Sequence, residues 1–98
     1  MAREQVDILE RAENSIFKFA KYIDKQGYPD RTFSFVSDIY EFLNSLSISG
    51  DSFAVCRHKA FAKKDYKCLP YKKNYIIILS IQNDIVTIHN VIPAKKIR

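Results

Sequence analysis

The residues of this chain that could do chemistry are concentrated in its second half. Residues 52–98 contain ten Lys and Arg against two Asp and Glu, which gives a charge of +8. Residues 1–51 contain six Lys and Arg against nine Asp and Glu, so their charge is −3 and the net charge of the chain is +5. This asymmetry indicates an anionic partner for the second half, either nucleic acid or an acidic protein.

The cations of the second half form three groups that could contact such a partner. A basic loop surrounds Phe61, whose ring could stack on a base while its neighbours neutralise phosphate; a solubilising loop with Phe61 on the core is the alternative. A pair of lysines precedes a predicted strand, and a tail follows the last predicted strand directly. The candidate binding residues are Arg57, Lys59, Lys63 and Lys64 in the loop, Lys72 and Lys73 before the strand, and Lys95, Lys96 and Arg98 in the tail.

Acid–base chemistry would have to rely on side chains other than carboxylates, which are sparse in residues 52–98. Two neighbouring cations favour the neutral form of His58, which suits a base. A set of Lys, Arg, His and Tyr can stabilise the phosphate transition state formed when a ribose 2′-OH attacks in line. The catalytic candidates are His58, Tyr75, His89, Lys95 and Lys96, with a structural role as the alternative for the histidines and Tyr75.

The two cysteines, Cys56 and Cys68, are expected to be reduced and partly buried thiols on strands. The histidines do not complete a metal-ligand pattern with them. We therefore expect no metal site and no cofactor.

Length and composition predict a single domain over residues 1–98 with enough apolar residues, 47%, to form a core. The longest uninterrupted apolar run, residues 75–79, is far too short to cross a bilayer. The N-terminal residues lack the apolar segment of a signal peptide. We expect a cytoplasmic protein that does not contact a membrane.

Hydrophobic periodicity predicts two helices, over residues 10–26 and 30–46. Gly27 and Pro29 should end the first helix, and Asp30 should cap the second. The short connection predicts a helical hairpin. The expected apolar faces are Ala12, Ile16, Phe19, Ala20 and Ile23 in the first helix and Phe35, Val36, Ile39, Tyr40, Leu43 and Leu46 in the second, with Phe33 and Phe42 widening the latter.

Strands are predicted on both sides of the hairpin, at 3–9 before it, where the start of a helix is the alternative, and at 52–57, 65–70, 74–81 and 85–92 after it. In the last strand, alternation should direct Val86, Ile88 and Ile92 to one face and Thr87, His89 and Val91 to the open face, away from the helices. The predicted fold class is α+β, in the order β-α-α-β-β-β, with the helical hairpin packed on a mostly antiparallel sheet.

Several segments, in this order, resemble the RelE/ParE superfamily of bacterial type II toxins. The first strand runs into the first helix through Val6-Asp7-Ile8-Leu9-Glu10-Arg11-Ala12, and residues 17–23, Phe-Lys-Phe-Ala-Lys-Tyr-Ile, are similar to the family's first helix. The best match is a short strand ending in Leu69-Pro70, followed by the step Asn74-Tyr75 into the long strand. A basic cluster after the final strand is also typical of this superfamily.

The resemblance implies a growth-inhibiting toxin of a plasmid stabilisation system, neutralised by a cognate acidic antitoxin, with which it could form a hetero-oligomer. Members similar to ParE poison DNA gyrase, and this is the preferred target. The alternative is a ribosome-dependent, metal-independent mRNA endoribonuclease similar to RelE. Such ribonucleases carry an Arg where this chain has Tyr75, and a Tyr after the terminal basic residues, where this chain has none. A third hypothesis is an inactive family member that binds only the antitoxin.

Overall fold

The computed structural model describes residues 5–46, 54–55, 66–82 and 85–97, and a pair of helices occupies most of the first range. α1 (Glu10–Lys25) ends as predicted, because Gly27 has a φ of 87°, a left-handed conformation that glycine adopts without steric cost. α2 (Pro29–Asn44) begins earlier than predicted, and Tyr28 rather than Asp30 is its N-cap. Proline suits the first position of a helix, where a backbone N–H would have no intrahelical partner. Among the helices of the described ranges, none is long and apolar enough to cross a membrane.

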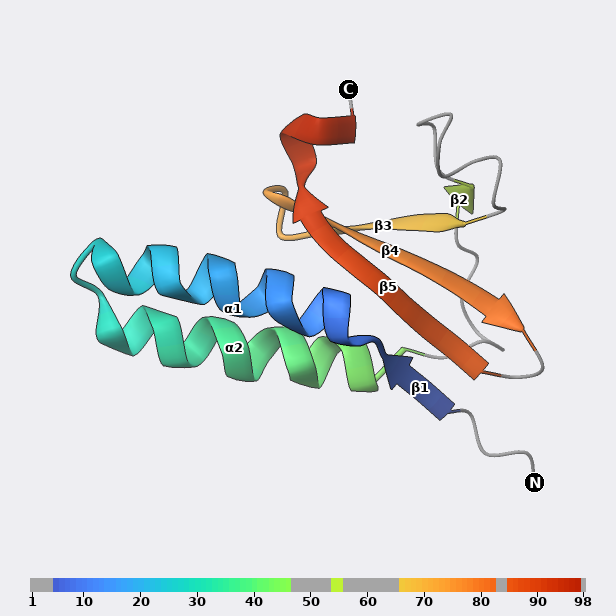
Figure 1. Ribbon diagram of the computed structural model, residues 1–98, viewed down its shortest axis with the longest axis horizontal. Helices are drawn as coiled ribbons and strands as arrows, with labels where there is room; N and C mark the ends of the chain where they lie inside the picture. The colour runs from blue at the N-terminus through green and yellow to red at the C-terminus, as the bar shows by residue number, and fades with distance from the viewer. Residues whose placement is uncertain (1–4, 47–53, 56–65, 83–84, 98) are drawn as a thin grey trace.

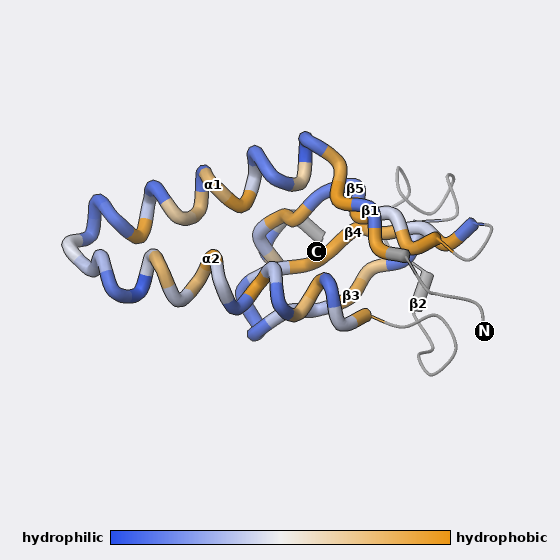
Figure 2. The backbone as a smooth tube through the Cα atoms, turned by 90° about the horizontal axis from the view of Figure 1, so that it is seen from below, coloured by the Kyte–Doolittle hydropathy of each residue, from blue (hydrophilic) through white to orange (hydrophobic). Residues whose placement is uncertain are grey.

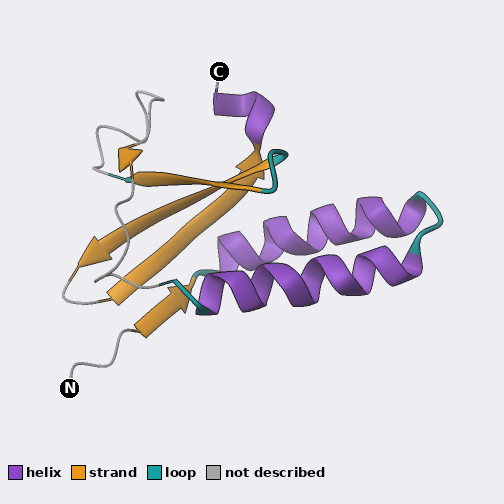
Figure 3. Ribbon diagram, turned by 180° about the vertical axis from the view of Figure 1, so that it is seen from behind, coloured by secondary structure: helices purple, strands orange, loops and turns teal. Residues whose placement is uncertain are grey.

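The strands form one sheet in the order β1-β5-β4-β3-β2. They are β1 (Gln5–Ile8), β2 (Ala54–Val55), β3 (Lys67–Tyr71), β4 (Tyr75–Gln82) and β5 (Ile85–Pro93). β1 pairs with β5 in parallel, and the other neighbouring pairs are antiparallel. The strand expected over residues 52–57 is described only as the two-residue β2. The longer strands and the helices follow the predicted order β-α-α-β-β-β, so the predicted α+β class is confirmed (Figures 1 and 3).

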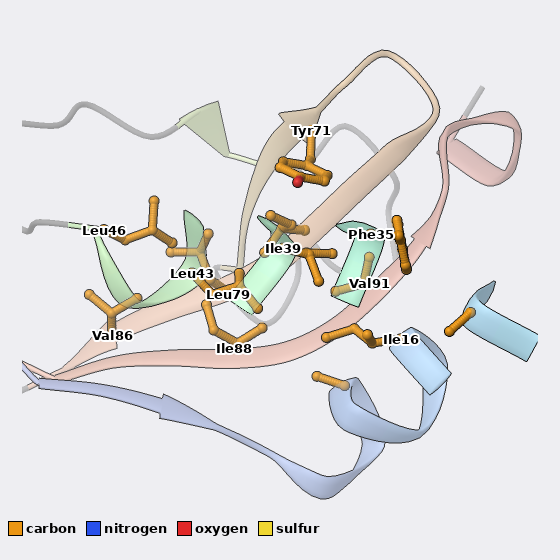
Figure 4. Packing of buried hydrophobic residues seen from close by; sticks show 13 residues of the cluster. Ile16, Phe35, Ile39, Leu43, Leu46, Tyr71, Leu79, Val86, Ile88 and Val91 are labelled. Atoms are coloured by element: carbon orange, nitrogen blue, oxygen red, sulfur yellow. The ribbon is translucent and has the colours of Figure 1, made fainter. Parts of the chain in front are cut away.

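The helical hairpin packs against one face of the sheet, and its free end projects beyond the sheet (Figures 1 and 3). The residues predicted to hold it there lie in the core: Ile16, Ile39 and Leu43 are fully buried, and Ala20 is buried. They meet the inward-facing residues of β4 and β5, including Leu79, Val86 and Ile88 (Figure 4). Figure 2 shows the same pattern, since hydrophobic positions recur along both helices and gather in β4 and β5.

One residue expected to widen the apolar face of α2 does not do so. Phe33 has 78% of its surface exposed, whereas Phe42 packs against the core and its ring centroid lies 4.9 Å from that of Tyr71. Phe33 lies two residues before the buried Phe35, about 200° around the helix from it, so the two side chains point to opposite sides of α2. Phe33 is therefore on the solvent side.

A β-bulge interrupts the pairing of β4 with β5 and changes which residues of β5 face the core. Ile78 pairs with Asn90 but its neighbour Leu79 pairs with Ile88, so His89 is the extra residue. Val86 and Ile88 are buried as predicted, but the next buried residue is Val91, and Ile92 is only partly buried. The expected facing of Val91 and Ile92 is therefore wrong, because a bulge shifts the two-residue alternation by one.

The expectation of reduced thiols is also wrong for Cys68. This residue of β3 is disulfide-bonded. The chain contains one other cysteine, Cys56, which lies outside the described residues. The twelve-residue spacing carried no signal that separated a bridged pair from two thiols, because bridging depends on how strands are placed in space.

Candidate functional site

The structure describes about half of the residues predicted to form a binding surface. The basic loop, with Arg57, His58, Lys59, Lys63 and Lys64, and the terminal Arg98 lie outside the described residues. Lys96 is placed through its backbone, in the 3-10 helix η1 (Ala94–Ile97) that follows β5. The predictions that can be followed in space concern Lys72, Lys73, Tyr75, His89 and Lys95.

Three of these residues come together in a hollow beside α1, where the turn between β3 and β4 meets the start of η1. Its volume is about 480 Å³. Lys73 and Lys95 supply its charge, and Tyr75 lies among its aromatic residues. We call it the cationic hollow, and it is lined by Phe19, Tyr22, Lys73, Asn74, Tyr75, Pro93, Ala94 and Lys95.

An unusual turn positions Lys73 at the cationic hollow. Lys72 and Lys73 have φ values of 50° and 66°, so two consecutive lysines adopt the left-handed conformation that side chains other than glycine rarely take. The N–H of Asn74 donates to the carbonyl of Lys72 at 2.7 Å. The N–H of Ala94 donates to the carbonyl of Asn74 at 2.9 Å, which joins η1 to the turn. The backbone segments that carry Lys73 and Lys95 are therefore fixed relative to each other.

Lys72 does not belong to the cationic hollow, although it is the neighbour of Lys73. Its Nζ lies 3.6 Å from Oδ2 of Asp38 and 5.5 Å from the centroid of the Tyr71 ring. It lines a different hollow, of about 650 Å³, which also contains Asp30 and Arg31 of α2. The predicted pair of turn lysines is therefore divided between two surfaces, one cationic and one of mixed charge.

Tyr75 is the first residue of β4 and packs under the helical hairpin. Its ring centroid lies 4.9 Å from that of Phe19 and 5.3 Å from that of Phe35. Burial, and to a lesser extent the neighbouring Tyr71, raise the pKa of the Tyr75 phenol above its usual value. At neutral pH the residue is therefore an uncharged phenol in an aromatic cluster.

His89 lies on the other face of the sheet, where it was predicted. Its Nε2 is 2.7 Å from Oγ of Ser80, and its ring stacks on Tyr66 with 4.2 Å between centroids. Ser80 follows Leu79, whose side chain faces the helices, so it points to the open face. A third hollow lies here, with a volume of about 370 Å³, and its lining includes Glu10, Arg11 and Ile78 with Tyr66 and His89.

The structure therefore separates the predicted site into two. Lys73, Tyr75 and Lys95 share the helix-covered side, and His89 lies on the open face. Sequence reasoning missed Tyr22 and Asn74 in the first group and Ser80 in the second. Ser80 alone carried a signal, as a small polar residue inside the apolar run of β4.

Known protein families and curated proteins add no assignment to this geometry. No protein-family model matches the chain, and no curated protein is detectably similar to it. Function must therefore be argued from the residues and their arrangement.

Proposed function

We propose that the chain is the toxin of a type II toxin–antitoxin pair, similar to ParE, and that it inhibits growth by binding DNA gyrase. The element order β-α-α-β-β-β, the hairpin on one sheet face and the basic segment directly after β5 support this proposal, because the resemblance implies all three. The observation that favours binding over RNA cleavage is the position of Tyr75.

Tyr75 occupies the place where the resemblance to RelE-type ribonucleases implies an Arg. Its ring is packed against Phe19 and Phe35, and a tyrosine phenol, whose pKa burial raises further here, is uncharged at neutral pH. An uncharged phenol cannot neutralise the negative charge that develops on a scissile phosphate. Loss of one such electrostatic donor typically costs a factor of about 100–1000 in rate.

The separation of His89 from the cations also disfavours a nuclease. Lys73 and Lys95 lie on the helix-covered side, whereas His89 contacts Ser80 and Tyr66 on the open face. Within the described ranges, the proton-transfer candidate and the phosphate-neutralising candidates therefore do not face one common point. General acid–base catalysis requires the base within hydrogen-bond reach of the reacting group.

An acidic antitoxin segment suits the described surface. The hairpin presents three aromatic side chains to solvent, with 54% to 78% of their surface exposed: Phe17, Tyr22 and Phe33. Cations lie beside Tyr22 at the cationic hollow. Binding should weaken with salt, but only partly, because apolar burial does not depend on screening. The test measures the affinity for the acidic protein encoded beside this chain at low and at high ionic strength. An affinity wholly independent of salt would exclude the basic surface as the docking site.

The target is tested by two assays run side by side with the purified protein. We expect inhibition of supercoiling by gyrase and an intact message in ribosomal toe-printing. Message cleavage in the ribosomal A site, abolished by Lys95→Ala with Lys96→Ala, would replace the proposal with a RelE-type ribonuclease. If neither effect is seen while the antitoxin still binds tightly, the protein is an inactive member of the family.

A cytoplasmic location is part of this proposal, because gyrase and ribosomes are cytoplasmic. The disulfide at Cys68 is an opposing observation, since disulfides are rare in the reducing cytosol. Alkylation of thiols in intact cells distinguishes a cytoplasmic location from an oxidising compartment. Labelling of Cys68 in cells supports the cytoplasmic location, and protection until a reductant is added contradicts it.

A further inference from the structure

We infer that the cationic hollow binds a nucleoside monophosphate unit, with the phosphate between Lys73 and Lys95 and the base on Tyr22. This inference goes beyond the toxin assignment and does not depend on it. The hollow's volume of about 480 Å³ lies within the range of about 300–1,000 Å³ typical of small-molecule sites.

The charge of the hollow favours a phosphate. Its lining contains two lysines and no carboxylate. Lys18 precedes Tyr22 by four residues on α1, so the two residues share one side of that helix. A phosphate monoester carries a charge between −1.5 and −2 at neutral pH and can satisfy two ammonium groups at once. A single carboxylate would leave one lysine without a counter-ion.

The aromatic content of the hollow favours a ligand with a flat ring. Tyr22 is 65% exposed, so one face of its ring is accessible from solvent. Phe19 and Tyr75, which also line the hollow, are held in contact with each other at 4.9 Å between centroids. Bases of any identity stack on such a surface, and the exposed Asn74 offers an amide for the base edge or the sugar.

The backbone shows that this arrangement is built into the fold. Two left-handed lysines in succession are unfavourable, and such strain persists only where the surrounding structure imposes it. The bond from the Ala94 N–H to the Asn74 carbonyl fixes the start of η1 against that turn. The turn directs Lys73 to the hollow and Lys72 to Asp38, so the side chains of two adjacent lysines reach different surfaces.

This divergence provides a matched control. Lys73→Ala and Lys72→Ala each remove one positive charge from the same turn, but only Lys73 lines the hollow. We expect 5′-AMP, measured by calorimetry or NMR titration at low salt, to bind at least about tenfold more weakly to Lys73→Ala and to Lys95→Ala. Lys72→Ala should change the affinity by less than about twofold, because its Nζ lies beside a carboxylate.

The ligand's two parts are tested separately. Adenosine and inorganic phosphate should each bind more weakly than 5′-AMP, and Tyr22→Leu should weaken 5′-AMP by about tenfold through lost stacking. Tyr28→Leu, which changes a half-exposed tyrosine outside the hollow, should have no effect on it. A further comparison uses two trinucleotides, one with a 5′-phosphate and one without it, to distinguish the end of a nucleic acid strand from a free nucleotide as the ligand. Tighter binding of the phosphorylated trinucleotide would identify the strand end as the ligand.

Two results would overturn the inference. One is the absence of 5′-AMP binding at millimolar concentration by the wild-type protein, whose fold is checked by circular dichroism. Another is an equal loss in Lys72→Ala and Lys73→Ala, which would indicate diffuse charge attraction. Neither of these results depends on gyrase inhibition, so failure here and failure of the proposed function are distinguishable.

Discussion

Oγ of Ser15 donates a hydrogen bond of 2.6 Å to Oδ1 of Asn90, although the two residues are 75 positions apart in the sequence. The same oxygen accepts a hydrogen bond of 2.8 Å from the backbone N–H of Val91. Asn90 directly follows the bulge residue His89, so this side chain fastens the irregular part of β5 to α1. His89 and Asn90 line the same hollow, so the Ser15–Asn90 bond ties the start of α1 to the strand beside that hollow.

Ser15→Ala should lower the free energy of unfolding by about 0.5–1.5 kcal/mol, because Asn90 loses a partly buried donor. Urea denaturation measures the change. Ser37→Ala, at an exposed position of α2, is the control, since it makes the same substitution in a helix. Equal effects of both substitutions would show that the Ser15–Asn90 bond adds nothing to stability. Asn90→Ala should also destabilise, and its effect should not add to that of Ser15→Ala.

Ile39→Ala should destabilise the protein by about 2–5 kcal/mol, because the Ile39 side chain is fully buried between the hairpin and the sheet. The melting temperature should fall accordingly. Phe33→Ala removes a larger side chain from the same helix, but Phe33 is 78% exposed. We therefore expect Phe33→Ala to stay within about 0.5 kcal/mol of the wild type. An unchanged melting temperature for Ile39→Ala would contradict the assignment of the core.

Stability should fall as the pH rises above about 10, the usual pKa of tyrosine. The pKa of Tyr75 is raised by burial and then by Tyr71, and that of Tyr40 by burial and then by Glu13. A group whose pKa is higher in the folded state than in the unfolded state binds more protons when the protein is folded. Its contribution to stability is complete at pH values below the pKa of the unfolded state. That contribution is lost as the pH rises through the pKa of the folded state. Tyr75→Phe should therefore flatten the alkaline part of the urea midpoint profile.

The free energy of unfolding of Lys73→Gly should exceed that of Lys73→Ala by about 0.5–1 kcal/mol. Both variants lose the same side-chain charge, but only glycine adopts a φ of 66° without strain. Denaturant midpoints of the two variants measure this difference directly. A more stable alanine variant would mean that the left-handed turn costs little in this fold. The comparison is independent of ligand binding, since neither variant retains the lysine.

The helices and longer strands could be predicted because each depends on a local signal. The stripe through Ala12, Ile16 and Ala20 follows a helical period, and Gly27 marks the end of α1 through a conformation that few other residues adopt. The start of α2 was misplaced because Asp30 is a good cap in isolation, whereas Pro29 fixes the helix one residue earlier. Local patterns thus define where elements form, and backbone constraints set their ends.

The arrangement of the candidate site depended on features that have no local signal. The bulge at His89 arises from pairing between β4 and β5, so simple alternation predicted the wrong facing for Val91. The left-handed turn divides Lys72 from Lys73, which a run of two lysines does not reveal. Tyr22 was recognised only as a helix residue, because its place beside Lys95 depends on how α1 packs against β5 and the start of η1.

The parallel pairing of β1 with β5 sets the order in which a nascent chain can complete this fold. β1 leaves the ribosome first, but its partner begins at Ile85, so the edge of the sheet must wait until most of the polypeptide has been synthesised. Until β4 and β5 emerge, the apolar face of the hairpin, with Ile16 and Ile39, has no sheet to cover it. Non-local pairing of this kind slows folding and leaves hydrophobic surface open to aggregation or to chaperones during translation.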